Sequence, residues 1–393
     1  MKVMFNHVEL EKVLRDVVRV VPTSTNKVVL KHILIKADKD EERVDVYASS
    51  LDMSIRRTLY QEAADSPVVI EGSGACLLPA KELFEIVKRA KDQITLTSSE
   101  KKAQIAFGKT KYELSGLEPD LFTPYTDNPD DTTTVVLVAP ELHRLLRRTT
   151  YAVYEGNARP VLTGVNLTVS DTGIHAVATD GMRLAEYTVV CKSVSGEPRS
   201  LPVPAVLLDK LVAVLPARDD DEEVTLTLGP SSCTVSWDDD MYRMVMRGLE
   251  GVYPDTSRVI PQNPPIKVVV DRQALLEACE RVSVLSETEH EVEFRISPER
   301  VVLFTQSAQY GYATDTVDVK SSTQTGEEMI IHCNIHYWIA LLRSYEGVEL
   351  VEAGFTNAKQ TFTVKPVDGS GLGLIAPMLN APAQSATSKR KSA

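Results

Sequence analysis

Three stretches of the chain share one helical pattern of apolar positions. In residues 8–21, 139–153 and 271–285, apolar side chains recur every three or four positions, the spacing that gives a helix one buried stripe. The equivalent leucines are Leu10, Leu142 and Leu275, which lie 132 (142 minus 10) and 133 (275 minus 142) residues apart. Near-equal spacing of a matching pattern predicts an internal repeat rather than three unrelated helices.

A second helix follows in each repeat, and strands surround it. The second helices are predicted at 77–90, 202–216 and 332–345, and two of them contain a Pro-Ala step suited to a helix start. Segments such as RVDVYASS, QITLTS and VTLTLG alternate between apolar and polar residues, which is the pattern of a strand with one buried face. The chain is therefore predicted to be an α+β protein built from one unit used three times.

Polar, proline-rich segments divide these units. TDNPDDTTT at 126–134 and PQNPPIK at 261–267 read as linkers, so three domains are predicted. The domains are expected at 1–129, 130–262 and 263–379. Residues 380–393 are small and polar and end in Lys389, Arg390 and Lys391, which favours a disordered tail.

The composition favours a soluble cytoplasmic protein. Hydrophobic residues make up 43% of the 393 residues and charged residues 25%, and no apolar run is long enough to span a bilayer. The start of the sequence lacks the apolar core of a signal peptide. Five widely spaced cysteines, an odd number, argue for reduced thiols rather than a disulfide framework.

Positive charge gathers on two of the repeated helices although the formal net charge is −12. Three cations lie off the apolar stripe of the first helix, and the second repeat has arginines at matching positions, whereas the third has Glu277 and Glu280 there. Such a row attracts a phosphate backbone without reading its sequence. The predicted DNA-contacting cations of these helices are Lys12, Arg15, Arg19, Arg144, Arg147 and Arg148.

Four motifs, together with the repeat, resemble one known family. They are LLPAKELFEIVKRA, RPVLTGVNL (159–167), ATDGMRLA (178–185) and YPDTSRVIP (253–261). They are similar to the bacterial replicative sliding clamp, the beta subunit of DNA polymerase III, over nearly the whole chain. The resemblance implies three tandem clamp-type domains in each chain and a ring of two chains, with helices lining the lumen and antiparallel sheets outside.

The resemblance also implies a function without catalysis or cofactor. A clamp encircles double-stranded DNA, independent of sequence, and tethers the DNA polymerase III catalytic subunit, so that it acts as a processivity factor in DNA replication. A clamp loader would open the likely homodimer, since the sequence has no phosphate-binding Gly-x-x-x-x-Gly-Lys motif. No membrane partner is expected.

A peptide-binding pocket is the partner site that the resemblance implies, with aliphatic walls and Arg183 and Arg258 at its polar rim. Met182 stands where family members often have His, and APMLN replaces a common Met-Pro-x-Arg-Leu ending. The pocket residues are expected to be Leu162, Thr179, Gly181, Met182, Arg183, Leu184, Pro254, Arg258, Val259, Leu374, Ile375, Ala376, Pro377 and Met378.

The resemblance also implies which residues form the dimer interface, here called the seam, and which lie on two DNA-contacting loops. The seam would use Lys109, Lys111, Tyr112 and Leu114 of one chain and Val284 and Leu285 of the other. The matching acidic segment, TQSAQYGYATD at 305–315, has Asp315 as its one acid, so the seam electrostatics are altered. Lys27, beside Asn26, and Arg159 are the loop cations expected on DNA phosphates.

Other readings remain open at this level. A virus- or plasmid-borne clamp with altered partner preference would also fit the divergent pocket and seam. A metal-dependent DNA-processing enzyme could use the Asp-rich segments at 218–223 or 237–241, and HCNIH at 332–336 could suggest a metal site. A peptide-binding scaffold without DNA contact is the third alternative. We expect no metal and no catalytic residue.

Overall fold

The computed structural model describes residues 1–61, 67–99, 101–125, 131–216, 221–287 and 290–378. The predicted tail at 380–393 and residues 126–130 of the predicted linker at 126–134 lie outside the described residues.

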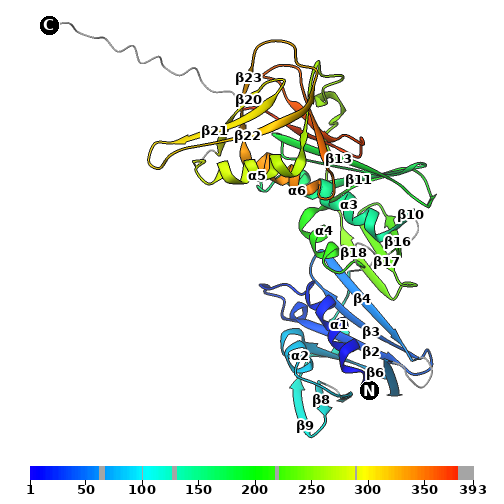
Figure 1. Cartoon of the computed structure of the whole chain (residues 1–393). Coiled ribbons are helices and arrows are strands. Elements are labelled where there is room, and N and C mark those ends of the chain that lie inside the picture. The colour runs from blue at the N-terminus through cyan, green and yellow to red at the C-terminus, as the bar shows by residue number, and fades with distance from the viewer. Residues whose placement is uncertain (62–66, 100, 126–130, 217–220, 288–289, 379–393) are drawn as a thin grey trace, which may run out of the picture. The chain divides into compact units, whose positions relative to one another are not determined.

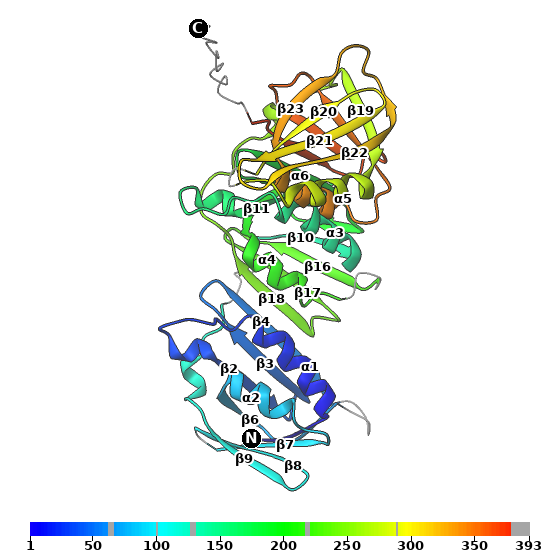
Figure 2. The ribbon, with the colours of Figure 1, turned by 60° about the vertical axis from the view of Figure 1, so that its left-hand side comes forward.

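The described residues form two compact units, and neither unit is one continuous segment (Figures 1 and 2). Unit 1 contains residues 1–146, 164–175 and 189–252. Unit 2 contains residues 147–163, 176–188 and the described residues from Tyr253 onward. Strands β12 (Gly173–Thr179) and β13 (Arg183–Val190) each contribute residues to both units, and the turn between them belongs to unit 2.

The predicted pairs of helices are confirmed. They are α1 (His7–Val18) with α2 (Ala80–Val87), α3 (Ala139–Thr150) with α4 (Ala205–Val212), and α5 (Arg272–Ser283) with α6 (Ile335–Ser344). The α1 stripe of Leu10, Val13, Leu14 and Val17 is fully buried. The pairs α1/α2 and α5/α6 each lie side by side (Figures 1 and 2).

The second helix of each pair begins later than predicted. Pro79 and Pro204 have extended backbone angles at the helix N-cap, so the residues before them belong to strands β6 (Gly74–Pro79) and β15 (Arg199–Pro204). In the third pair, Asn334 is the N-cap of α6 because its side chain accepts the His336 N–H at 2.9 Å. The preceding residues form β23 (Met329–Asn334).

Unit 1 is built on antiparallel sheets, as predicted. Its nine-stranded sheet has the order β14 (Ser193–Ser195), β10 (Thr133–Val138), β16 (Glu223–Leu228), β17 (Ser232–Trp237), β18 (Tyr242–Arg247), β4 (Met53–Tyr60), β3 (Arg43–Ser49), β2 (His32–Asp38) and β6. Its five-stranded sheet has the order β5 (Val68–Gly72), β1 (Lys2–Phe5), β7 (Ile94–Ser99), β8 (Lys102–Phe107) and β9 (Thr110–Ser115). Strand β11 (Gly164–Ser170) pairs with β15.

Strands β4 and β18 join the first two repeats within unit 1. Tyr242 pairs with Arg57 and Met246 pairs with Met53 in antiparallel register. The Arg57 guanidinium lies 3.1 Å from the centre of the Tyr242 ring, so a buried cation is placed on an aromatic face. This pairing explains why the contacts group two sequence repeats into one unit.

Unit 2 contains most of the twelve-stranded sheet and a large apolar core. From β13, the order continues through β26 (Leu372–Ile375), β25 (Phe362–Pro366), β24 (Leu350–Phe355), β19 (Ile266–Asp271), β22 (Gly311–Ser322), β21 (Arg300–Ser307), β20 (Glu291–Ile296) and β23. Trp338 of α6 stacks on both Phe294 and Phe362 in this core.

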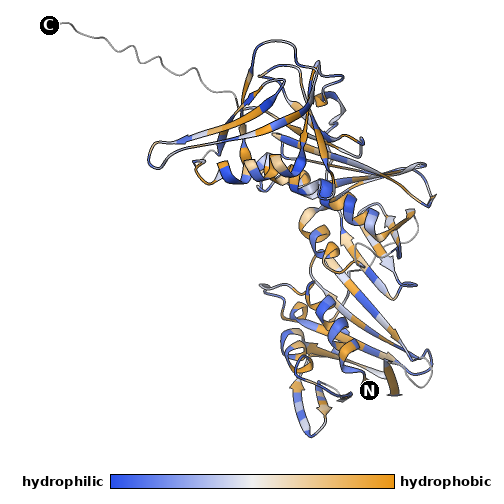
Figure 3. Cartoon of the chain, in the orientation of Figure 1, coloured by the Kyte–Doolittle hydropathy of each residue, from blue (hydrophilic) through white to orange (hydrophobic). Residues whose placement is uncertain are grey.

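Hydrophobic and hydrophilic residues interleave along the strands and helices (Figure 3). Because one face of each element packs on a core, this distribution is the one expected from the sequence pattern. Among the described residues, no helix has the length and apolar character needed to cross a membrane.

Candidate functional site

The turn between β12 and β13 is held in one conformation by Asp180. Its Oδ1 accepts the backbone N–H groups of Met182 and Arg183, both at 2.8 Å, and its Oδ2 accepts the Arg183 Nε–H at 2.9 Å. Thr179 Oγ1 donates to the Arg183 carbonyl at 2.6 Å. Gly181 has a φ of +94°, a conformation that L side chains rarely adopt. The turn is therefore braced by its own polar groups.

Arg183 is covered rather than exposed at a rim. Its side chain is 10% exposed, and its guanidinium lies 4.7 Å from the centre of the Tyr337 ring and 6.0 Å from that of Tyr151. The charge is thus shared between the Asp180 carboxylate and an aromatic face. This differs from the expectation of a polar rim contact, because packing from α6 covers the guanidinium.

An apolar cluster lies beneath the turn. Leu184, Val177 and Leu374 are buried together, and Tyr253, Ile260 and Leu372 pack against them. The Tyr253 hydroxyl oxygen accepts the Thr179 N–H at 3.1 Å. Burial raises the pKa of Tyr253 to about 12, so its phenol stays neutral at physiological pH. The YPDTSRVIP segment is therefore packed directly against the turn.

The C-terminal strand completes the same surface. Strand β26 pairs with β13, with Leu374 opposite Leu184 and Ile375 opposite Arg183. Beyond the strand, the Ala376 N–H donates to the Met182 carbonyl at 2.8 Å. Three segments that are distant in the sequence therefore meet at one turn.

The predicted pocket residues separate into a buried set and an exposed set. Leu162, Thr179, Leu184, Leu374, Ile375 and Pro377 are buried. Gly181, Met182, Pro254, Arg258 and Val259 are exposed, and Arg183, Ala376 and Met378 are intermediate. Met182 is 47% exposed and Val259 56%, so these two offer apolar surface for a partner. Arg258 is on the short helix η4 (Ser257–Val259), 3.6 Å from Asp255.

Sequence reasoning missed four residues that hold this turn. The sequence predicts a bend at Asp180-Gly181 but not the hydrogen bonds with which Asp180 holds it, and Tyr253 lies inside a quoted motif without an assigned structural role. Tyr151 and Tyr337 lie on other segments, and nothing in the local pattern links them to Arg183. An acidic residue followed by Gly is the one signal that could have indicated the brace, since Asp side chains often accept hydrogen bonds from the turn that follows them.

The predicted DNA-contacting cations occupy different surroundings. Lys12, Arg15 and Arg19 are exposed on or just after α1, and Arg15 pairs with Glu11 at 2.6 Å. Arg144 is exposed and forms an ion pair with Glu141. Arg147 forms an ion pair with Glu346 and donates to the Arg343 carbonyl at 3.0 Å.

Arg148 does not match the expectation of a solvent-facing cation. It is 7% exposed, and its guanidinium lies 4.8 Å from the centre of the Tyr187 ring and 5.4 Å from that of Tyr345. It also donates to the hydroxyl and carbonyl oxygens of Ser370. The side chain is engaged inside unit 2, so we leave it out of the proposed DNA contacts.

The two loop cations are exposed. Lys27 precedes the short helix η1 (Val28–Lys31), and its N–H donates to Thr25 Oγ1 at 3.1 Å. Arg159 precedes η3 (Pro160–Thr163), and its guanidinium lies close to Gly181, 3.3 Å from where a β-carbon would stand. A side chain at 181 would therefore crowd Arg159.

The predicted seam residues lie on exposed strands and a helix end. Lys109 and Lys111 are exposed at β9, the last strand of its sheet, and Tyr112 and Leu114 are half-buried. Val284, at the end of α5, is 78% exposed, and Leu285 is half-buried.

Asp315, the one acid in the matching segment at 305–315, is engaged within the chain. Its Oδ2 accepts from the Arg281 Nε–H at 2.6 Å, and this hydrogen bond lowers the pKa of Asp315. Among the described residues, β21 is the strand that pairs with residues 311–316 of β22.

The described residues contain no cluster of three or more His, Cys, Asp or Glu side chains arranged to hold a metal ion. In HCNIH, Cys333 is buried, and His336 meets His290 edge-to-face with ring centres 4.2 Å apart. Asp238, Asp239 and Asp240 have positive φ angles in the turn between β17 and β18, where Asp240 pairs with Arg56 and Arg243. Residues 218–220 of the other Asp-rich segment, at 218–223, lie outside the described residues.

Comparison with family profiles gives three consecutive matches. The N-terminal domain of the DNA polymerase III beta subunit matches residues 1–126, its central domain matches residues 137–255, and its C-terminal domain matches residues 257–378.

Individual relatives and solved structures agree. The chain is 30% identical to the beta sliding clamp of Synechococcus elongatus over 361 residues, covering 89% of this chain and 92% of that one. It is 28% identical to the beta sliding clamp of Staphylococcus aureus over 350 residues, with 88% and 90% covered. The crystal structure of the DNA polymerase sliding clamp from Bacillus subtilis has a TM-score of 0.90 and 26% identity, covering 97% of this chain and 100% of that one.

Proposed function

This chain belongs to the DNA polymerase III beta subunit family, and from this premise we propose that two copies close around duplex DNA and hold a polymerase at the turn Thr179–Leu184. The chain is a DNA sliding clamp, a processivity factor without an active site of its own. The observation that carries the proposal is the run of all three beta-subunit domains in order from residue 1 to residue 378.

Partner binding is proposed to use the exposed apolar residues around the braced turn. Met182 and Val259 present flexible or branched apolar side chains, while Leu184, Leu374 and Tyr253 beneath them are packed. Because Asp180 fixes the turn in advance, little conformational entropy is lost when a peptide binds. A tethered polymerase then has a high effective concentration at its template.

DNA contacts are proposed for Lys12, Arg15, Arg19, Lys27, Arg144 and Arg159, with Arg147 as a weaker contributor. The first six cations are exposed in a chain with a net charge of −12, whereas Arg147 is half-buried as well as paired with Glu346. Scattered long cations attract phosphates without selecting bases. Weak contacts of this kind permit sliding, and retention follows from topology.

The homodimer is proposed to close by joining β9 of one chain to residues 311–316 of β22 in the other. Tyr310 and Tyr312 are 71% and 68% exposed, and β9 carries Tyr112 and Leu114. An exposed strand edge with aromatic neighbours favours pairing with another chain. Asp315 is paired with Arg281, so this seam depends more on backbone and apolar contacts than on ion pairs.

A clamp loader is the proposed source of ring opening, and the cytoplasm is the proposed location.

The test of the proposed function measures retention of the protein on DNA. With its loader and ATP, the protein should stay on nicked circular duplex through gel filtration and leave once the circle is cut. Equal loss from intact and cut circles would contradict the ring, and hydrolysis of DNA with Mg²⁺ or Mn²⁺ would instead support the enzyme alternative.

A further inference from the structure

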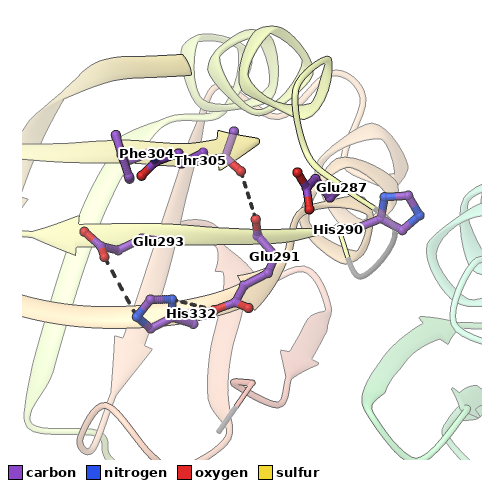
Figure 4. A pocket seen from close by; sticks show the side chains of 8 residues that line it. Glu287, His290, Glu291, Glu293, Phe304, Thr305 and His332 are labelled. Atoms are coloured by element: carbon purple, nitrogen blue, oxygen red, sulfur yellow. Dashed lines mark hydrogen bonds and ion pairs between the residues drawn. The ribbon is translucent and has the colours of Figure 1, made fainter. Parts of the chain in front are cut away.

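A cavity of about 430 Å³ opens in unit 2, where β23 ends the order of its sheet. Its lining includes the carboxylates of Glu287, Glu291 and Glu293, with His332 and Phe304. Figure 4 shows the two carboxylates of β20 on either side of the His332 ring. The lining is acidic with one aromatic wall, which suits a long cationic side chain.

The carboxylates are held in place by the strands and the turn that carry them. His332 Nδ1 lies 2.8 Å from Glu291 Oε1, and its Nε2 lies 3.9 Å from Glu293 Oε2. Glu287 Oε1 accepts the Ala308 N–H at 2.9 Å. Arg295 pairs with Glu293 and neutralises part of this charge. The imidazoles of His290 and His332 also line the cavity. Arg295 is the one arginine or lysine paired with these three carboxylates among the described residues, so the cavity is able to accept further cations.

The cations that could enter this cavity are present in the chain's own C-terminal residues. The last described residue, Met378, donates its N–H to the His332 carbonyl at 2.7 Å, so the chain leaves unit 2 beside the cavity. Residues 379–393 contain Lys389, Arg390 and Lys391 and no Asp or Glu. Lys389 is eleven positions after Met378 (389 minus 378), and eleven residue steps span up to about 36 Å.

We propose that the Lys389–Lys391 segment of the chain's own tail docks in the acidic cavity formed by Glu287, Glu291, Glu293 and His332. The tail starts within one hydrogen bond of a lining residue, which gives its cations a high effective concentration there. The same carboxylates repel the phosphates of DNA. Exposed ion pairs are individually weak and are screened by salt, so the docking is reversible.

The test measures the distance between the tail and the cavity in the full-length chain. Nitroxide labels are placed at Ser392→Cys and Gln306→Cys, with Cys191→Ser removing the half-buried native thiol. Double electron–electron resonance should show a short-distance population. That population should fall about fivefold in Glu287→Gln/Glu291→Gln/Glu293→Gln and at high salt.

Glutamine keeps the shape and the acceptor oxygen of glutamate, so the fold is expected to survive, and thermal melting checks this. Glu299→Gln/Glu327→Gln/Glu328→Gln removes the same charge from elsewhere in the same unit and should leave the distances unchanged.

Three results would overturn the proposal. One is an identical distance distribution in the parent and the cavity variant. Another is loss of the short distance on dilution with unlabelled chain, which would place the tail on a second copy. The third combines two observations: the short distance is missing in the free protein, and the motion of the nitroxide at residue 392 slows when the ring is loaded on circular DNA. That result would make the tail a DNA contact.

Discussion

Asp180 and Arg183 hold each other across the turn, with 2.9 Å between the carboxylate Oδ2 and Nε, and both side chains are nearly covered. The pair occupies the centre of the proposed polymerase-binding surface without offering its own charge to a partner. Its role is to position Met182, which lies between the two residues in sequence and is exposed. Affinity for a partner peptide should then depend on Asp180 although the peptide does not touch it.

Asp180→Ala tests this dependence. The substitution removes two backbone hydrogen bonds and one ion pair, so we expect the free energy of unfolding to fall by about 2 kcal/mol and peptide affinity to fall about tenfold. Titration with a polymerase C-terminal peptide and denaturant unfolding measure the two effects. Asp38→Ala is the matched control, since Asp38 Oδ1 also accepts two backbone N–H groups in an exposed turn. Equal peptide affinity in parent and D180A would remove Asp180 from the site.

Met182→Ala should lower peptide affinity about threefold to tenfold while leaving stability unchanged. Its side chain is 47% exposed, so its apolar surface contributes mainly when a partner covers it. Calorimetric titration and thermal melting separate the two effects. Val190→Ala trims an 83% exposed apolar residue on the same strand as Arg183 and serves as the control. An affinity loss of the same size in V190A would mean that the effect is not local.

Lys12→Glu/Arg15→Glu/Arg19→Glu should shorten the lifetime of the ring on nicked circular DNA about tenfold at low salt and leave peptide affinity intact. Each reversal replaces a phosphate attraction with a repulsion, so the difference should shrink as salt rises. Lys36→Glu/Lys39→Glu/Lys101→Glu makes the same change in net charge at other exposed lysines. If both triple variants lose the same retention, net charge rather than the α1 cations is responsible.

Arg148→Ala should lower the stability of the fold and leave retention on DNA unchanged. Removing a buried guanidinium from between Tyr187 and Tyr345 and from Ser370 should lower the free energy of unfolding by about 2 kcal/mol. Arg144→Ala, an exposed arginine on the same helix, should change stability by less than about 0.5 kcal/mol. Denaturant unfolding compares the two, and a DNA-retention defect without a stability loss in R148A would return Arg148 to the DNA-contacting set.

Leu114→Asp should dissociate the proposed dimer, whereas Lys109→Ala/Lys111→Ala should weaken it less than about tenfold. Asp315 already forms an ion pair with Arg281, so an additional pairing with the lysines would stabilise the dimer little. A carboxylate at position 114 would be buried by the partner strand, which is costly. Sedimentation across a concentration series gives both dissociation constants. A larger effect of the lysine substitutions would show that ion pairs carry the seam.

The helix pairs could be predicted from the sequence because their cause is local. The stripe around Leu10, with its copies at Leu142 and Leu275, depends on side chains one turn apart. The turn at Asp180-Gly181 has the same local origin. The exact helix starts were not predicted from the local pattern. Helices α2 and α4 begin later than expected, because Pro79 and Pro204 are N-cap residues rather than first-turn residues.

The surroundings of the arginines could not be predicted, because they depend on residues far away in sequence. Arg183 lies over Tyr337, 154 residues later (337 minus 183), and Arg148 reaches Ser370, 222 residues later. Both arginines look like surface cations in their own segments. The grouping of the chain into two compact units could not be predicted for the same reason, because it depends on the pairing of β4 with the distant strand β18.

The pairing of β13 with β26 sets an order on folding during synthesis. Residues 183–186 acquire their partner strand, residues 372–375, only after those later residues have left the ribosome. Until then the edge of β13 is open, and open edges are where nascent chains pair wrongly with one another. The surface proposed to recruit a polymerase therefore cannot form before residues 372–375 have been synthesised, and a chain terminated before them would lack it.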